Sequence, residues 1–375
     1  MQETRRAAGW AALRVLWAAL AILGGALPGS PVLAAEREDD GLTEAVLDEI
    51  ENTPLLRQIP ASLKRIEAQK KAGGAAAVRH PVLPTDLEDA VAQKALWARR
   101  ADGLLNECTE EEWLRLVPRQ SPRGPSVTSP VKGFEKSNAW KWDPHKPDQI
   151  ICAASGVTFP NPDYPVKYKR VKVLSGKTVD VPYYETHGGK GKTLVRARID
   201  CEKTLYMTRA LGMLARAYAA TRDERYARRV AIALDAWADY YPDYFITLGQ
   251  NGTEPINPEE GARTNFRVER ASHYNGFGHE MTAAFVSIFD DIYDSEALQA
   301  LSKERKRDVR AHIANDLYMN FVDYFRNYVP LPTLASTNLP GSVVSAACVG
   351  VMLNRLDVIQ WVDSYKARRP ITRWW

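Results

Sequence analysis

The sequence predicts a mainly α-helical protein built of helical hairpins, with a loop-rich, partly β segment at about 118–192. Apolar residues recur with helical spacing through most of residues 207–353. Between 118 and 192, by contrast, proline and glycine are frequent and only short runs alternate like strands. The composition, with 45% hydrophobic and 26% charged residues in a chain of 375, is that of a globular protein and excludes disordered, collagenous and disulfide-scaffold classes.

The first 34 residues have the pattern of a signal peptide. Basic residues precede an apolar run over 15–27, and Val32-Leu33-Ala34 fits a signal-peptidase cleavage site. The alternative, an uncleaved anchor, would need about 20 apolar residues to span a bilayer, and this run is shorter. We therefore expect an exported protein, periplasmic or secreted, that has no stable membrane insertion after cleavage.

The charge balance argues against a nucleic-acid partner. The formal net charge of +4 falls to +2 without residues 1–34, because 47 basic and 45 acidic residues then remain. A nucleic-acid-binding surface normally carries a larger excess of basic residues. The four cysteines have no CxxC spacing, and a chain of this length can build its core without disulfides. We expect mostly free, buried thiols, with one bridge compatible with export.

The elements before the helical half are shorter. Over residues 35–85 we expect a polar helical or linker segment, which contains prolines and the linker-like glycine and alanine stretch at 73–77. A helix is expected from about Asp86 to Leu105. Thr109-Glu110-Glu111-Glu112 is a capping box and predicts the start of a second, short helix.

Within the loop-rich segment we expect strands over about 171–174 and 179–184. Five helices then follow. A second capping box, Thr221-Arg222-Asp223-Glu224, places a tight turn between the first two, which predicts an antiparallel pair. The apolar stripes of the five helices extend over 207–218, 226–241, 281–292, 313–324 and 343–353. Such hairpins stack into a bundle, a superhelix or a closed α/α toroid, and periodicity does not choose among the three.

The polar connection over 250–280 is the first candidate functional segment, because it is too long for a minimal helix connection. Arginine binds carboxylates and sulfates bidentately, and histidine and tyrosine transfer protons. A carboxylated sugar is therefore the natural ligand. The candidates are Arg263, Asn265, Arg267 and Arg270 for substrate binding, and His273, Tyr274, His279 and Glu280 for catalysis. The alternative is a solvated network in which these arginines pair with nearby glutamates.

The second candidate is Asn338, in the stretch 336–340 that enters the fifth helix. Its amide either faces a cavity or caps the helix. No cofactor and no metal are expected, because His273 and His279 lack the i, i+4 spacing of a helical zinc site. No nucleophile elbow and no phosphate-binding glycine loop occur in the sequence.

Several segments together resemble secreted heparinase II/III-like proteins, over roughly residues 88–355. The segments are Trp140–Pro144, Pro147–Cys152, Val157–Asn161, Val181–Tyr184, Tyr206–Tyr241 and Phe289–Ser295. The resemblance implies an α/α toroid followed by a β-sandwich. It also implies polysaccharide lyase chemistry on uronate-containing glycans such as glycosaminoglycans, in polysaccharide degradation.

The resemblance also implies roles for side chains. In such a lyase an Asn, His or Glu neutralises the uronate carboxylate, a Tyr or His removes the C5 proton, and another group protonates the leaving oxygen. The sugar–oxygen bond then breaks by β-elimination, and no water is consumed. Stabilisation of the enolate-like intermediate is the largest energetic contribution. Asn338 matches the neutralising Asn, although Leu339 follows it where some heparinases have His.

The C-terminal end departs from the family pattern. The catalytic Tyr and second catalytic His of the family lie beyond the matching Asn, whereas this chain ends at Trp375 and has an atypical tail over 356–375. We therefore expect an incomplete toroid over 86–355, no β-sandwich, and a lyase that is weakly active or inactive. Its base would come from Tyr274, His273 or His279.

Two other function classes stay open at this point. One is a non-catalytic helical module that binds acidic glycans through Arg263, Arg267 and Arg270 together with exposed aromatic residues. The other is a glycoside hydrolase on a similar toroid. A hydrolase needs two carboxylates about 5–10 Å apart in its cleft, and Glu280 is the one acid with evident cleft context.

Overall fold

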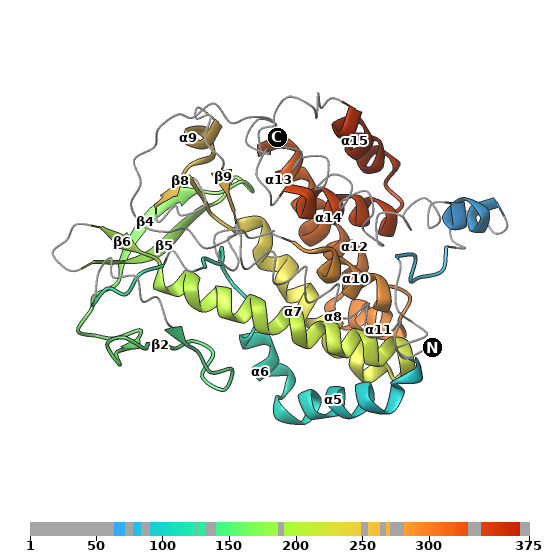
Figure 1. Cartoon of the computed structure of the whole chain (residues 1–375), viewed down its shortest axis with the longest axis horizontal. Coiled ribbons are helices and arrows are strands. Elements are labelled where there is room, and N and C mark those ends of the chain that lie inside the picture. Colours follow the sequence, from blue (N-terminus) through green and yellow to red (C-terminus); the bar gives the residue numbers. More distant parts are fainter. Residues whose placement is uncertain are drawn as a thin grey trace, which may run out of the picture. The chain divides into compact units, whose positions relative to one another are not determined.

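The computed structural model describes residues 64–71, 78–83, 91–124, 127–131, 140–186, 191–248, 254–262, 268–270, 281–328 and 339–367. All of them belong to one compact unit, Leu42–Trp375. The predicted signal peptide lies outside them. Within the described ranges the chain is mainly helical and has three small sheets (Figure 1), so the predicted class, mainly α with a partly β segment, is confirmed. Among these residues, no helix combines the length and the apolar character needed to cross a bilayer.

The helices fall before and after the strand-rich segment. They are α5 (Lys94–Glu107), α6 (Glu110–Arg115), α7 (Val195–Thr221), α8 (Glu224–Tyr240), α9 (Pro258–Ala262), α10 (Ala283–Ile292), α11 (Glu296–Arg305), α12 (Val309–His312), α13 (Asn320–Tyr328), α14 (Leu339–Met352) and α15 (Leu356–Ala367). A 3₁₀ turn, η3 (Tyr241–Asp243), follows α8. A π-helical segment, η5 (Ile313–Met319), joins α12 to α13.

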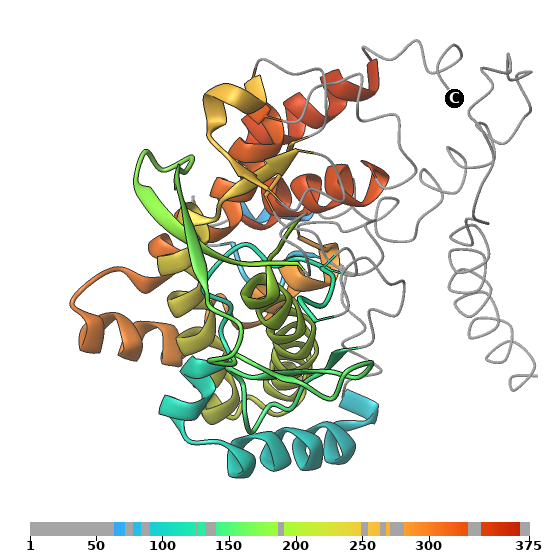
Figure 2. The ribbon, with the colours of Figure 1, turned by 90° about the vertical axis from the view of Figure 1, so that its left-hand side faces the viewer.

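The strands are short and antiparallel. They are β1 (Trp140–Lys141), β2 (Ile150–Cys152), β3 (Thr158–Phe159), β4 (Lys167–Lys172), β5 (Thr178–Glu185), β6 (Lys192–Thr193), β7 (Ile246–Leu248), β8 (Pro255–Ile256) and β9 (Val268–Glu269). The sheet orders are β1-β2-β3, β4-β5-β6 and β8-β7-β9. In the β4–β5 hairpin Val171 pairs with Val179. Figure 2 shows this hairpin beside the start of α7, where β5 contacts that helix.

Two successive helical hairpins form the centre of the unit. The first is α7 with α8, and the second is α10 with the run from α11 to α13. A Cβ placed at Gly212 of α7 would lie 4.0 Å from Ile288 of α10. One turn later, the positive charge of Arg216 is close enough to Asp291 of α10 to oppose the rise that burial causes in the pKa of its carboxyl. A later residue of α7 therefore meets a later residue of α10, so the two helices run in the same direction.

The second helices of the two hairpins also run in the same direction. Near the start of α8, Glu224 accepts a hydrogen bond of 2.9 Å from the backbone N–H of Ala297. Further along, Arg228 pairs with Glu304 at 3.2 Å. The array therefore repeats one hairpin geometry, as stacked helical hairpins do.

One large apolar cluster joins the helices from α5 to α8 and from α10 to α15. Trp113, Phe289 and Tyr318 are among its fully buried side chains, and the rings of Phe289 and Tyr318 stack at 5.3 Å. Burial of each large apolar side chain contributes about 1.5–3 kcal/mol. The predicted inner stripes of the helices are therefore the surfaces that make this core.

The first capping box is confirmed. The Thr109 hydroxyl accepts from the Glu112 backbone N–H at 3.2 Å, and the Glu112 carboxylate accepts from the Thr109 N–H at 2.8 Å. The second box is different, because the N-cap of α8 is Asp223, whose carboxylate accepts from Arg225 N–H at 3.0 Å. Thr221 still belongs to α7.

Three helices end in a residue with left-handed backbone geometry that carries a side chain. Arg222 after α7 has φ 60°, and Lys306 after α11 and Asn354 after α14 each have φ 52°. Glycine is the usual residue at such a position. These turns end α7, α11 and α14 and lead to α8, α12 and α15.

Several elements differ in extent from their prediction. The helix α7 starts at Val195, before its predicted stripe. The fourth predicted stripe is not a plain α-helix, because η5 lies within it. The helix α15 occupies 356–367, in the range that the sequence assigns to an atypical tail.

Candidate functional site

Arg270 is the predicted site residue that lies within the described ranges. It follows β9 and is 1% exposed. The carbon Cζ of its guanidinium lies 4.2 Å from the ring centroid of Tyr241 and 4.5 Å from that of Tyr324. Its Nη1 donates to Asn320 Oδ1 at 2.5 Å, and its backbone N–H donates to the Tyr324 hydroxyl at 3.0 Å.

These contacts place Arg270 at one end of the helical array. Tyr241 directly follows α8, and Trp237 near the end of α8 packs on Phe285 near the start of α10, with ring centroids 4.9 Å apart. The chain therefore enters the segment after Arg270 at the end of the array where α8 ends and α10 begins. Beyond that segment, Met281 is buried in the large core.

The other candidates lie outside the described residues. They are Arg263, Asn265 and Arg267 among the substrate-binding candidates, and His273, Tyr274, His279, Glu280 and Asn338 among the catalytic ones. Their roles stay predictions. Arg270 itself contacts protein groups here, and glycan binding by its guanidinium also stays a prediction.

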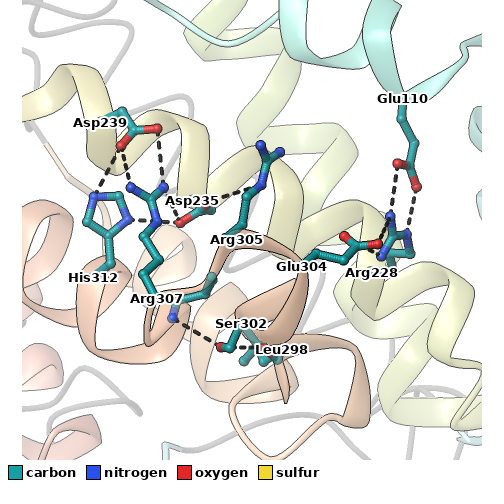
Figure 3. Close-up of polar contacts among 11 residues, drawn as sticks. Glu110, Arg228, Asp235, Asp239, Leu298, Ser302, Glu304, Arg305, Arg307 and His312 are labelled. Carbon is teal, nitrogen blue, oxygen red and sulfur yellow. Dashed lines mark hydrogen bonds and ion pairs between the residues drawn. The ribbon is translucent and has the colours of Figure 1, made fainter. Parts of the chain in front are cut away.

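A polar cluster that the sequence analysis did not identify lies between α8 and η5. His312 Nδ1 is 2.8 Å from Asp235 Oδ1, and its Nε2 is 3.3 Å from Asp239 Oδ1. Arg307 lies between the same two carboxylates, at 2.7 Å from Asp235 and 2.9 Å from Asp239 (Figure 3). Asp316 lies 3.7 Å from His312 Nε2.

This cluster can orient a histidine but does not leave it free. A buried carboxylate that binds one imidazole nitrogen is the arrangement that prepares a histidine for proton transfer. Here, however, the second nitrogen also faces carboxylates, from Asp239 and Asp316. Hydrogen bonding to Asp239 raises the pKa of Arg307. The cluster therefore joins α8 to the turn before α12 and to η5 by internally paired charges.

A second polar cluster lies around the end of α10. His80 Nδ1 is 2.5 Å from Asp290, and the His80 ring stacks on Tyr293 at 3.9 Å. The carboxylate of Asp290 also accepts from Leu83 N–H at 2.7 Å. The segment Phe289–Ser295, one of those that carry the resemblance, therefore anchors residues 78–83.

Asp291, the next residue, has a carboxyl oxygen, Oδ1, without a hydrogen-bond partner. Burial, together with the nearby charge of Asp290, raises its pKa to about 8, and Arg216 and Arg222 oppose this shift. Asp291 is 8% exposed. At neutral pH this carboxyl is therefore mostly protonated.

A third cluster joins α7 to the strand-rich segment. The buried ammonium of Lys203 donates to the Arg115 carbonyl at 2.7 Å and to Asp148 at 2.9 Å. Burial lowers the pKa of Lys203. Burial alone would raise the pKa of Asp148, but the hydrogen bond and the charge of Lys203, together with neighbouring arginines, outweigh it, and the pKa of Asp148 falls to about 2. These contacts tie α7 to the end of α6 and to the segment that contains Asp148.

No cluster of three or more His, Cys, Asp or Glu side chains in the described part of the chain has the arrangement of a metal site.

The polar cluster between α8 and η5 has a local signal in the sequence. Asp235 and Asp239 are spaced i, i+4 on α8, and His312 and Asp316 have the same spacing, so each pair shares a helix face.

Comparison with known proteins assigns no family. No protein-family model, no curated protein and no solved structure matches the chain.

Proposed function

We propose that this chain is a polysaccharide lyase-like protein that acts on uronate-containing glycans by β-elimination. The observation that carries the proposal is the position of Arg270, which is buried between two tyrosines where α8 ends and α10 begins. The predicted catalytic segment follows it directly in the sequence. The order of the segments that resemble heparinase II/III-like proteins supports the same function.

The stacked hairpins of an α/α toroid are the arrangement we propose for the helices. Its support is the repeated hairpin geometry, in which α10 follows the direction of α7 and α11 follows that of α8. An exported location, periplasmic or secreted, is part of the same proposal and is supported by the pattern of residues 1–34.

In the proposed reaction the Asn338 amide donates to the uronate carboxylate, which makes the C5 proton more acidic. Tyr274, His273 or His279 accepts that proton. The electron pair of the C5–H bond forms the C4–C5 double bond, the C4–O bond breaks, and the leaving oxygen takes a proton from a second acid. Stabilisation of the negative charge on the carboxylate is the step that Asn338 serves.

The test is direct, because the product has a conjugated double bond. The purified chain is incubated with alginate or heparan sulfate, and absorbance is followed in the unsaturated-uronate band. We expect a rise in absorbance that Asn338→Ala reduces by about 100-fold. Asn106→Ala, at an exposed position of α5, is the matched control and should leave the rate unchanged.

The other outcomes separate the function classes. Binding without absorbance identifies a glycan-binding module, and new reducing ends without absorbance identify a hydrolase. Either result contradicts the lyase proposal. A rate that is the same in the Asn338→Ala variant contradicts the role of Asn338 while leaving the reaction class intact.

A further inference from the structure

The helix α7 carries two exposed arginines, Arg209 and Arg216. They are seven residues apart, so they share one face and lie about 10.5 Å apart along the helix. Between them are Gly212 and Met213, both partly buried. Both arginine side chains are exposed on one face of the helix, so their guanidinium groups can reach one ligand that lies along it.

The helix α5 flanks this face on one side and supplies a fixed aromatic support. The guanidinium carbons of Arg216 and Arg100 each lie 5.5 Å from the ring centroid of Trp97. An aromatic ring beside a guanidinium favours the cation and restricts its rotation. Arg216 is therefore held in place before a ligand arrives, which lowers the entropy that binding would cost.

The positive charge on this face is not neutralised within the described ranges. No ion pair is formed there by Arg100, Arg209 or Arg216, although many other arginines of the chain form one, such as Arg170 with Asp180. Glu202, two turns before Arg209, is hydrogen-bonded to Arg198. The carboxyl of Asp291, on α10, interacts electrostatically with Arg216. It is mostly protonated at neutral pH, because its pKa is about 8.

We propose that Arg209 and Arg216, with Arg100 and Trp97, form a surface on α7 and α5 that binds the carboxylate or sulfate groups of an acidic polysaccharide. The surface is separate from the Arg270 cluster: Arg216 lies in the last two turns of α7, and Arg270 contacts Tyr241, beyond the end of α8. The identity of the sugar class rests on the proposed function, whereas the preference for spaced anions rests on the arginines.

The spacing of the two arginines favours a polysaccharide over a nucleic acid. Duplex DNA carries one phosphate per about 1.7 Å of its axis, and its binding surfaces are correspondingly dense in basic residues. Here the two exposed arginines are about 10.5 Å apart along the helix axis, which suits the separated anions of an extended polysaccharide chain. Guanidinium also pairs bidentately with a planar carboxylate, which lysine does not.

The test measures affinity for size-defined alginate and heparan sulfate oligosaccharides, with dextran as the neutral probe. Arg209→Ala combined with Arg216→Ala should raise the Kd for both acidic probes by at least about tenfold. The matched control is Arg170→Ala with Lys303→Ala, which removes two exposed charges on β4 and α11 and should change the Kd less than twofold. Thermal unfolding of each variant shows that the fold is retained.

Two further variants sharpen the result. Arg209→Lys with Arg216→Lys keeps the charge and should recover only part of the affinity, because the bidentate geometry is lost. Equal Kd values for the Ala variant and the native chain, or an equal loss in the control pair, would overturn the proposal. So would a tenfold preference for oligonucleotides or for anionic phospholipid vesicles.

Failure of this inference and failure of the proposed function are distinguishable. If the chain binds acidic glycans through these arginines but produces no unsaturated uronate, the surface stands and the lyase proposal fails. If uronate elimination occurs and the arginine variants bind and react as the native chain does, the lyase proposal stands and the surface fails.

Discussion

Asp291 is a buried carboxyl with an unpaired oxygen and a pKa raised to about 8. In the unfolded chain its pKa returns to near the ordinary 3.8. Between these two values the folded chain keeps a proton that the unfolded chain loses. Asp291 therefore makes the folded state progressively less stable as pH rises from about 4 to about 8, with no further change above that window.

Asp291→Asn removes this dependence, because the amide does not titrate. We expect the difference in Tm between variant and native chain to shift in favour of the variant from pH 5 to pH 9, as measured by calorimetry. Asp323→Asn, at an exposed carboxyl, is the control and should show little shift. A Tm difference for Asp291→Asn that is the same at both pH values would contradict the buried, protonated carboxyl.

Arg270 gives a second prediction at the level of one side chain. Arg270→Lys cannot keep planar contacts with both Tyr241 and Tyr324 and the bond to Asn320. We expect a loss of about 2 kcal/mol in the free energy of unfolding, seen as a lower denaturant midpoint. Arg170→Lys, whose side chain is 75% exposed, should leave the midpoint within experimental error. If the two variants unfold alike, Arg270 does not anchor this end of the array.

At the scale of elements, two helical glycines differ in their surroundings. A Cβ at Gly350 of α14 would lie 2.9 Å from Ile359 Cγ1 and 3.2 Å from Val358 of α15, whereas nothing lies within 4 Å at Gly103 of α5. Gly350 therefore lets α14 and α15 approach closely. Gly103 has no such packing role, and as a glycine it lowers the helix propensity of α5.

The two alanine variants should have opposite effects on the free energy of unfolding. Gly350→Ala is expected to lower it by about 1–3 kcal/mol through overpacking. Gly103→Ala should raise it by about 0.5–1 kcal/mol, because alanine favours the helix. Urea titrations with equal m-values measure both effects. A stabilising Gly350→Ala would show that α15 does not pack on α14 as described.

Elements with local signals were predictable from the sequence. The capping box at Thr109 depends on two side chains three residues apart, and the structure contains it. The N-terminal half of α7 was missed, because it buries polar groups such as Asp200 and Lys203. Their partners, Arg119 and Asp148, are distant in sequence, so no local pattern marks these positions as buried.

At the scale of the whole molecule, the four cysteines are free and buried, in agreement with the expectation of mostly free thiols. Burial raises the pKa values of Cys201 and Cys348 to about 12, which suppresses the reactive thiolate. We expect slow alkylation of Cys201 and Cys348 in the native chain and labelling of all four thiols after unfolding, with or without reductant, by mass spectrometry. Two fewer labels without reductant would show a disulfide.

The whole-molecule organisation was predictable as a class and less so in detail. Helical periodicity indicated hairpins, since each apolar stripe needs a partner. The cluster of Asp235, Asp239, Arg307 and His312 was not predicted, because its residues come from two segments about 70 positions apart. Arg307 pairs with the carboxylates of both Asp235 and Asp239 across this separation.

The left-handed residues after α11 and α14, Lys306 and Asn354, are positions where substitution should raise the Tm. A residue such as Lys306 costs about 1–2 kcal/mol in this conformation, which asparagine adopts more readily, so glycine should stabilise the turn more at Lys306 than at Asn354. Lys306 and Asn354 share no described contact, so increments from Lys306→Gly and Asn354→Gly should add. The protein can thus be engineered toward higher temperature at its turns, away from every residue to which a function is assigned.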